Sequence, residues 1–274
     1  MSALCKDRVG EVLARLARVN DPELDESVTE LGFVTGVTVD EAGRVEVGFR
    51  LPTYWCAANF AFLMADDMRR EIKALEWVSS VGVELGDHMY AETINRAMKS
   101  GLSFQTAFAE EADGDLEDVR RIFAIKAFQR RQMVLLDHLL GLGHAVPALL
   151  GLTIEGLTAL AIDLNGRALI NRYLERRDVP GPAGPAELAF VDPAGQAVTL
   201  EGYDRHRREL RRVMVNVEFN GALCRGLLAA RFGETDATPS GEPTLLDFVR
   251  GRAPGSLIAS GAITPAETNE PTPK

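Results

Sequence analysis

The chain has 274 residues, of which 46% are hydrophobic and 26% are charged, and its formal net charge is −10. This composition is ordinary for a globular protein that buries its own core, so folding requires neither disulfides nor a structural metal. The negative charge argues against nucleic acids and anionic membranes as partners, and no apolar run approaches the roughly 20 residues that a membrane helix needs.

The first ninety residues predict a small mixed unit. Residues 4–18 place apolar side chains on one helical stripe, and Pro22 ends that helix. Residues 33–39 and 44–50 alternate with period two around a glycine-containing loop, which predicts a β-hairpin. A helix over residues 57–75 and a strand over 78–85 complete the unit. The order helix, strand, strand, helix, strand predicts an α+β fold.

The remainder is predicted to be mainly α-helical. Long helical patterns occupy residues 115–141 and 204–231, and beyond Glu234 the composition is typical of disorder. We therefore expect three regions: an α+β domain over residues 1–100, a mainly helical client-binding or partner-binding domain over 101–233, and a disordered tail over 234–274.

Two features outside the α+β unit are candidates for partner contacts. The arginines at positions 130 and 131, and those between 205 and 212, are interpreted as solvated helix faces rather than as a basic binding patch. An apolar segment interrupts the tail and contains Leu245, Leu246 and Phe248. Such a segment is either a docking peptide for a partner or an element that folds back on the body, and both interpretations stay open.

Cys56 lies at a position where a thiol can be reactive. It directly precedes the helix over 57–75, and the positive end of a helix is expected to lower a thiol pKa and favour the thiolate that binds soft metals. The alternative is that Cys56, like Cys5 and Cys224, is a small buried hydrophobic residue. Three widely spaced cysteines and the lack of a signal peptide indicate a reducing compartment, so we expect a cytoplasmic protein.

His88 follows the third predicted strand, with Asp87 before it and Glu92 after it. If the sheet brings this loop and the Cys56 loop to one edge, these side chains would form one site. A lone histidine is more often a hydrogen-bonded structural residue. The sequence contains no zinc-finger spacing, phosphate-binding glycine loop or nucleophile elbow.

Four segments occur in the order of a known family. They are Asp21-Pro-Glu-Leu24, Val28-Thr-Glu-Leu-Gly-Phe-Val34, Leu51-Pro-Thr-Tyr-Trp-Cys56 and Gly86-Asp-His-Met-Tyr-Ala-Glu-Thr-Ile-Asn95. Together with the predicted element order they resemble the metal–sulfur (iron–sulfur) cluster assembly domain family. Its members include SufT-type and PaaD-type bacterial proteins and the eukaryotic cytosolic targeting factors for iron–sulfur proteins. The resemblance covers roughly residues 5–98.

The resemblance implies that Cys56 is the family's reactive cysteine and a ligand of iron or of a cluster, with Asp21, Thr53 and His88 as neighbours. Glu92 stands next to a position where eukaryotic members commonly have glutamate. The chain departs from the family pattern at Ala57, where the family has proline after the cysteine.

The implied function is that of an accessory factor, not an enzyme, which assembles or delivers a cluster or metal centre to a client apoprotein. A multicomponent bacterial oxygenase is one client class. Because one cysteine cannot supply the usual four thiolates, a transient cluster would be labile, bridged across a homodimer or completed by a partner. The alternatives are a metal-free scaffold or chaperone for an apoenzyme and, less favoured, a thiol enzyme that uses Cys56 and His88.

Overall fold

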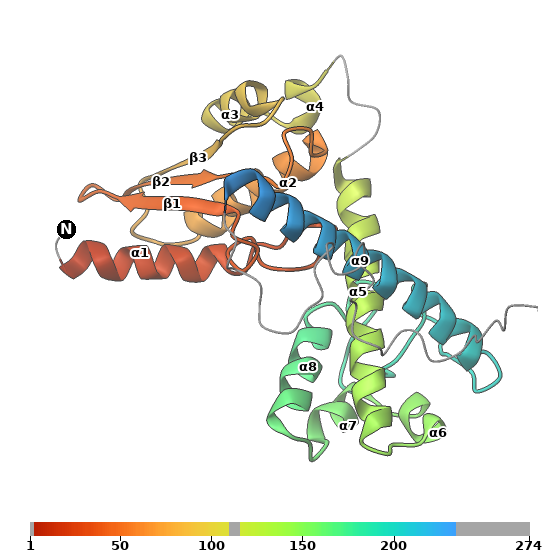
Figure 1. Ribbon diagram of the computed structural model, residues 1–274. Coiled ribbons are helices and arrows are strands. Elements are labelled where there is room, and N and C mark those ends of the chain that lie inside the picture. Colours follow the sequence, from red (N-terminus) through yellow and green to blue (C-terminus); the bar gives the residue numbers. More distant parts are fainter. Residues whose placement is uncertain (1–2, 110–115, 234–274) are drawn as a thin grey trace, which may run out of the picture.

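The computed structural model describes residues 3–109 and 116–233, with side chains from residue 7 onward (Figure 1). Its N-terminal unit has the expected order of elements. These are α1 (Ala3–Leu16), β1 (Val34–Val39), β2 (Arg44–Phe49), α2 (Ala58–Lys73), β3 (Ser80–Leu85), α3 (Ala91–Ser100) and the short α4 (Phe104–Ala107). The α+β prediction for this unit is confirmed.

The three strands form one sheet in the order β1-β2-β3. β1 and β2 are antiparallel, as the hairpin pattern predicts, and Val37 lies opposite Val47. β3 pairs with β2 in parallel, with Val47 beside Val83. Parallel neighbours need a long crossover, and α2 supplies it. As a result, β2 and β3 end at the same edge of the sheet, and the loops that follow them, 50–57 and 86–90, lie side by side.

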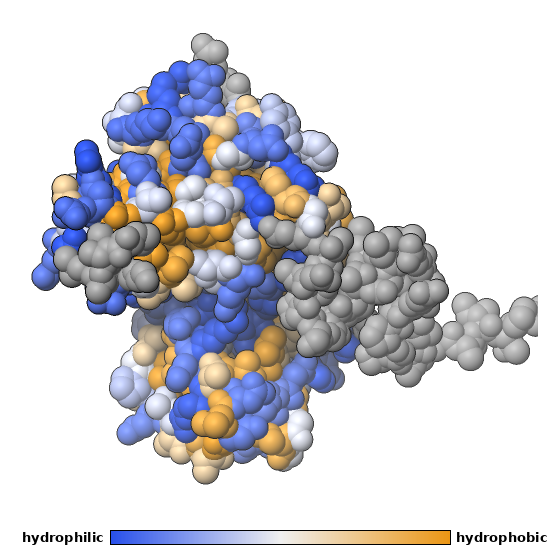
Figure 2. All heavy atoms as spheres, turned by 60° about the vertical axis from the view of Figure 1, so that its left-hand side comes forward, coloured by the Kyte–Doolittle hydropathy of each residue, from blue (hydrophilic) through white to orange (hydrophobic). Residues whose placement is uncertain are grey.

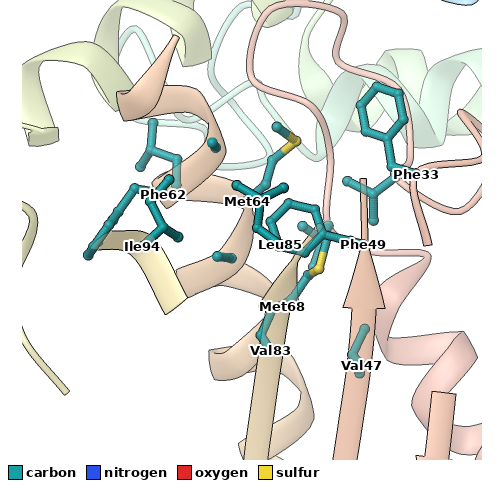
Figure 3. Close-up of a cluster of buried hydrophobic side chains, with 14 of the residues drawn as sticks. Phe33, Val47, Phe49, Phe62, Met64, Met68, Val83, Leu85 and Ile94 are labelled. Carbon is teal, nitrogen blue, oxygen red and sulfur yellow. The ribbon is translucent and has the colours of Figure 1, made fainter. Parts of the chain in front are cut away.

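The core of this unit lies between the sheet and its helices. Met64 and Met68 of α2 point toward Phe49 of β2 and Leu85 of β3 (Figure 3), and Ile94 belongs to α3, which packs against both β3 and α2. All five side chains are at most 2% exposed. The alternation of buried and exposed residues along β2 follows the period-two pattern of its sequence.

The second part of the chain is helical, as predicted. It contains α5 (Leu116–Gly141), α6 (Val146–Leu150), α7 (Ile154–Ala159), α8 (Leu164–Leu174) and α9 (Tyr203–Phe232). Phe128, Tyr173 and Phe190 stack at the centre of its core, with ring centroids 5.6 to 5.7 Å apart. The expected long helices over 115–141 and 204–231 correspond to α5 and α9.

α9 belongs to both parts of the molecule. Its N-terminal half contributes Leu210 to the helical core. The helix crosses α5 and then extends to the end of the sheet (Figure 1). Its C-terminal half contributes Leu228 to the core of the N-terminal unit. The predicted domain boundary near residue 100 remains a prediction. Helix α9 is continuous and contributes residues to both cores.

Within residues 3–109 and 116–233, no helix is both long enough and apolar enough to cross a bilayer. The predicted tail over 234–274, with Leu245, Leu246 and Phe248, lies outside the described residues.

Candidate functional site

Cys56 lies in the connection between β2 and α2, two residues before the helix begins. The connection starts with a hydrogen bond from the Arg50 amide to the Phe33 carbonyl (2.8 Å) and buries Leu51. The chain then turns outward, so that Tyr54 is 48% and Trp55 71% exposed, whereas Cys56 is half-buried. The thiol therefore lies just inside a projecting aromatic rim.

The loop after β3 binds directly to the cysteine loop. The Met89 amide donates to the Tyr54 carbonyl (2.9 Å), and His88 Nε2 lies 2.9 Å from the Cys56 carbonyl oxygen. Because His88 Nδ1 accepts from the Tyr90 amide (3.1 Å), the proton resides on Nε2, which donates to that carbonyl. Burial lowers the pKa of His88 and favours this neutral form.

The expected meeting of Cys56 and His88 at one edge of the sheet thus occurs, but through the cysteine backbone. Both ring nitrogens of His88 already have backbone partners. A metal ion would have to displace one of them, and the geometry identifies His88 as the residue that positions the Cys56 loop.

Arg231 of α9 connects the same two loops from the other side. Its guanidinium donates to the Leu51 carbonyl (3.1 Å) and to the Asp87 carbonyl (2.5 Å), and it forms an ion pair with the Asp87 carboxylate (2.6 Å). Asp87 has a φ of 46°, a conformation that aspartate tolerates better than most residues. Nothing in the sequence near residue 231 indicates this role, because it depends on how α9 packs.

Asp21 contributes a buried carboxylate. Its Oδ1 accepts from the amides of Glu23 and Leu24, both at 2.8 Å, which fixes the turn after α1. Burial raises the pKa of Asp21 to about 6 in spite of these two donors. The charge of Asp21 also contributes to the raised pKa of the Cys56 thiol.

The expected effect of the helix on Cys56 is wrong in direction. Burial, reinforced by the nearby charges of Asp21 and Glu23, raises the pKa of the Cys56 thiol to about 11, and the donor effect of the Ala57 amide does not compensate. At neutral pH the residue is a protonated thiol. The cost of desolvating the thiolate therefore exceeds the stabilisation that the helix N-terminus gives it.

Helix α9 carries a second described cysteine. Cys224 of α9 is half-buried and packs against the core of the N-terminal unit, in line with its expected packing role. Burial raises its pKa to about 12, and the charges of Asp21 and Cys56 contribute to this rise. The helical stripe around Cys224 predicts this packing against a core.

Thr53 and Glu92 complete the predicted set. Thr53 is half-buried in the cysteine loop, and Glu92 is exposed in the first turn of α3. Among the described side chains, no group of three or more His, Cys, Asp and Glu residues is arranged to hold a metal ion. The role of these five residues as metal ligands stays a prediction.

The turn that contains Asp21 also contacts the helical part of the chain. Arg131 of α5, 5% exposed, binds both carboxylate oxygens of Asp25 at 2.6 and 2.8 Å, and Arg172 of α8 donates to the Asp25 carbonyl. Arg130 of α5 and Arg225 of α9 both pair with Glu26. The interpretation of Arg130 and Arg131 as a solvated face is wrong, because Arg131 pairs with the buried carboxylate of Asp25 and Arg130 with the partly buried carboxylate of Glu26.

A charged recess of about 410 Å³ lies beside this contact. Its lining includes Asp21, Arg18, Asp67, Arg120 and Arg176 but not Cys56. Figure 2 shows hydrophilic side chains gathered at the waist between the two lobes of the molecule.

Comparisons with known proteins agree with the geometry of the N-terminal unit. A family described as "Iron-sulfur cluster assembly protein" matches residues 10–85, a segment that contains Asp21, Cys56 and all three strands. The uncharacterized protein MJ1129 of Methanocaldococcus jannaschii is 30% identical over 89 residues, which is 32% of this chain and 92% of that protein.

Proposed function

The chain belongs to the iron–sulfur cluster assembly protein family, and from this premise we propose that it delivers iron or a nascent cluster to a client apoprotein, with Cys56 as the residue that handles this cargo. The observation that carries the proposal is the location of Cys56. It lies inside the family-matching segment, half-buried at a loop that two other elements position through His88 and Arg231.

The state of the thiol fits a carrier. A protonated thiol reacts slowly with oxidants and electrophiles, so Cys56 is protected while no cargo is bound. A soft metal cation replaces the thiol proton when it binds. Because the described side chains offer an incomplete ligand set, the remaining coordination positions are available to sulfide, to a second copy of the chain or to the client. Incomplete coordination favours transfer over storage.

The surface beside Cys56 fits a protein client. Tyr54, Trp55 and Met89 are each at least 48% exposed, and the hydrogen bond from Met89 to Tyr54 holds them on adjoining loops. Exposed aromatic side chains and methionine are enriched in protein interfaces. A client docked on this rim would have its own metal ligands next to Cys56. The helical region supplies further partner surface, and a multicomponent oxygenase is the client class that the family resemblance suggests.

A metal-free scaffold is the second candidate, and the same rim favours it. In that case Tyr54, Trp55 and Met89 would bind and stabilise the client apoenzyme, while Cys56 would serve only in packing. The two functions differ in whether the protein takes up iron through Cys56. Neither function requires the chain to catalyse a reaction.

The decisive experiment is anaerobic reconstitution with ferrous iron and sulfide, read by absorbance and by metal analysis. Wild type is expected to take up iron in stoichiometric amounts, Cys56→Ser to lose that uptake, and Cys5→Ser to behave as wild type. Matching far-UV circular dichroism would show that the variants are folded. Uptake by Cys56→Ser equal to that of wild type would contradict the carrier function.

A further inference from the structure

The exposed apolar side chains beside Cys56 offer a surface that an apolar peptide can cover. Tyr54, Trp55 and Met89, which together are called the rim, are 48%, 71% and 49% exposed. The hydrogen bond from the Met89 amide to the Tyr54 carbonyl (2.9 Å) keeps the two loops of the rim together. Large apolar side chains that are exposed side by side favour an apolar occupant, because its binding removes their surface from water.

The end of helix α9 is fixed close to the rim. Figure 1 shows this end of α9 beside the end of the sheet. Arg231 donates to the carbonyls of Leu51 and Asp87. Leu51 lies three residues before Tyr54, and Asp87 lies two residues before Met89. Because consecutive residues span at most about 3.6 Å, the rim lies within about 11 Å of the residues that Arg231 binds.

The chain beyond α9 therefore starts beside the rim. Phe232 packs against the core of the N-terminal unit and lies under the guanidinium of Arg50 (4.1 Å), and Gly233 ends the helix with a φ of 71°. Residues 234–243 are mainly polar and include two prolines and a glycine. A connection of ten such residues spans about 17 Å on average and about 35 Å when extended. Residues 244–250, called the tail segment, follow directly and are within reach of the rim.

We propose that the tail segment binds the rim of its own chain and covers Cys56 until a client displaces it. The inference rests on the proposed function in so far as the rim is the client surface. The composition of the tail segment suits this contact, because four of its seven residues are large and apolar: Leu245, Leu246, Phe248 and Val249.

The short connection makes a weak contact sufficient. A segment attached through about ten residues has an effective concentration of about 1 mM at its binding surface. A contact with a Kd of about 0.1 mM is then closed in about nine molecules of ten. A client that needs the open rim binds about tenfold more weakly than it would without the tail segment. The contact therefore selects for clients that bind the protein at further surfaces as well.

The test uses Trp55 as the reporter, in the full chain and without metal. The chain has two tryptophans, so Trp77→Phe leaves Trp55 as the sole source of tryptophan fluorescence. In this background, acrylamide should quench Trp55 about threefold more strongly in the Leu246→Gln/Phe248→Gln variant than in the chain with the native tail. Far-UV circular dichroism checks that both are folded. Equal quenching of the two proteins would overturn the proposal.

Leu257→Gln/Ile258→Gln is the matched control, because it removes two apolar side chains from the same tail outside the tail segment. This control should be quenched like the native tail, and a rise equal to that of the tail-segment variant would overturn the assignment to residues 244–250. A peptide of residues 243–251, added at about 1 mM to the tail-segment variant, should restore the protection of Trp55, and no restoration would contradict the contact. Protection in the native chain should be the same at about 1 and 50 µM protein, and its loss on dilution would overturn binding within one chain.

The consequence for Cys56 has its own readout. Iodoacetamide should alkylate Cys56 about threefold faster in Leu246→Gln/Phe248→Gln than in wild type at constant pH, as measured by peptide mass spectrometry, and an unchanged rate would show that the tail segment does not cover the thiol. Failure of this inference and failure of the proposed function are distinguishable. Cys56-dependent iron uptake without any effect of the tail segment would refute the contact alone, whereas a protected Trp55 without iron uptake would keep the contact and refute the carrier.

Discussion

The buried ion pair between Arg131 and Asp25 gives the sharpest prediction about stability. Arg131→Met keeps a long apolar side chain on α5 but leaves the Asp25 carboxylate, 3% exposed, without its bidentate partner. Removal of one partner from a buried pair costs about 3–5 kcal/mol. Asn20 still donates to Asp25 (3.2 Å) and Arg176 lies 3.9 Å from it. We therefore expect Arg131→Met to lower the free energy of unfolding by about 3 kcal/mol.

For a protein of this size each kcal/mol corresponds to roughly 2–4 °C, so the variant should melt about 6–12 °C lower than wild type. Urea unfolding followed by far-UV circular dichroism measures the free energy directly. Arg207→Met is the matched control, because Arg207 connects helix α9 to α5 through Asp137 with about 40% of each side chain exposed. An exposed pair of this kind contributes at most about 1 kcal/mol.

The Asp25→Asn/Arg131→Met double variant tests the cause. Asparagine tolerates the positive φ of 51° at position 25, and removal of the charge eliminates the uncompensated carboxylate. The double variant should therefore recover part of the stability that Arg131→Met loses. An uncompensated charge is not the cause if Arg131→Met lowers the free energy of unfolding no more than Arg207→Met does. The same holds if the double variant loses more free energy of unfolding than the two single variants lose together.

Three further predictions concern the turn of the hairpin, the helical core and the aromatic rim. Gly43→Ala should cost about 2 kcal/mol or more in urea unfolding, because Gly43 has a φ of 79° and a Cβ there would lie 2.4 Å from the Trp77 carbonyl oxygen; an unchanged midpoint would contradict this. Burial lowers the pKa of His206 below its value in the unfolded chain, so the unfolded state binds more protons and wild type should lose stability as pH falls through about 6.5. His206→Gln should lack this component, and a stability difference from wild type that is constant between pH 7.5 and 5.5 would refute the assignment. Trp55→Ala should alter unfolding by less than about 0.5 kcal/mol, because the side chain is 71% exposed, and weaken client binding by about 1 kcal/mol or more in calorimetry; equal affinity would exclude Trp55 from the client surface.

The N-terminal fold could be predicted because its signals are local. Period-two alternation on both sides of Gly43 predicts the β1–β2 hairpin, and the apolar positions of α2 repeat at helical spacing. The parallel pairing of β3 with β2 has no such local signal. It follows from α2 as a crossover, and it is what brings His88 to the Cys56 loop.

The site was only partly predictable, because its chemistry depends on burial and on distant segments. The position of Cys56 before α2 indicates a candidate site, but the direction of its pKa shift depends on desolvation, which a sequence does not display. Arg231 reaches the site through the packing of α9 across both cores. The sequence around Arg131 has the pattern of a solvated helix face, and only the fold places Asp25 opposite this arginine.

The central claim is that Cys56 handles iron on its way to another protein, and cluster transfer tests it most directly. The anaerobically loaded protein is mixed with the apo form of a hydratase whose activity requires a four-iron cluster, and enzyme activity is followed over time. Wild type should restore activity faster than equal amounts of free iron and sulfide, and Cys56→Ser should do no better than those free components. Equal restoration by wild type and Cys56→Ser would contradict the account.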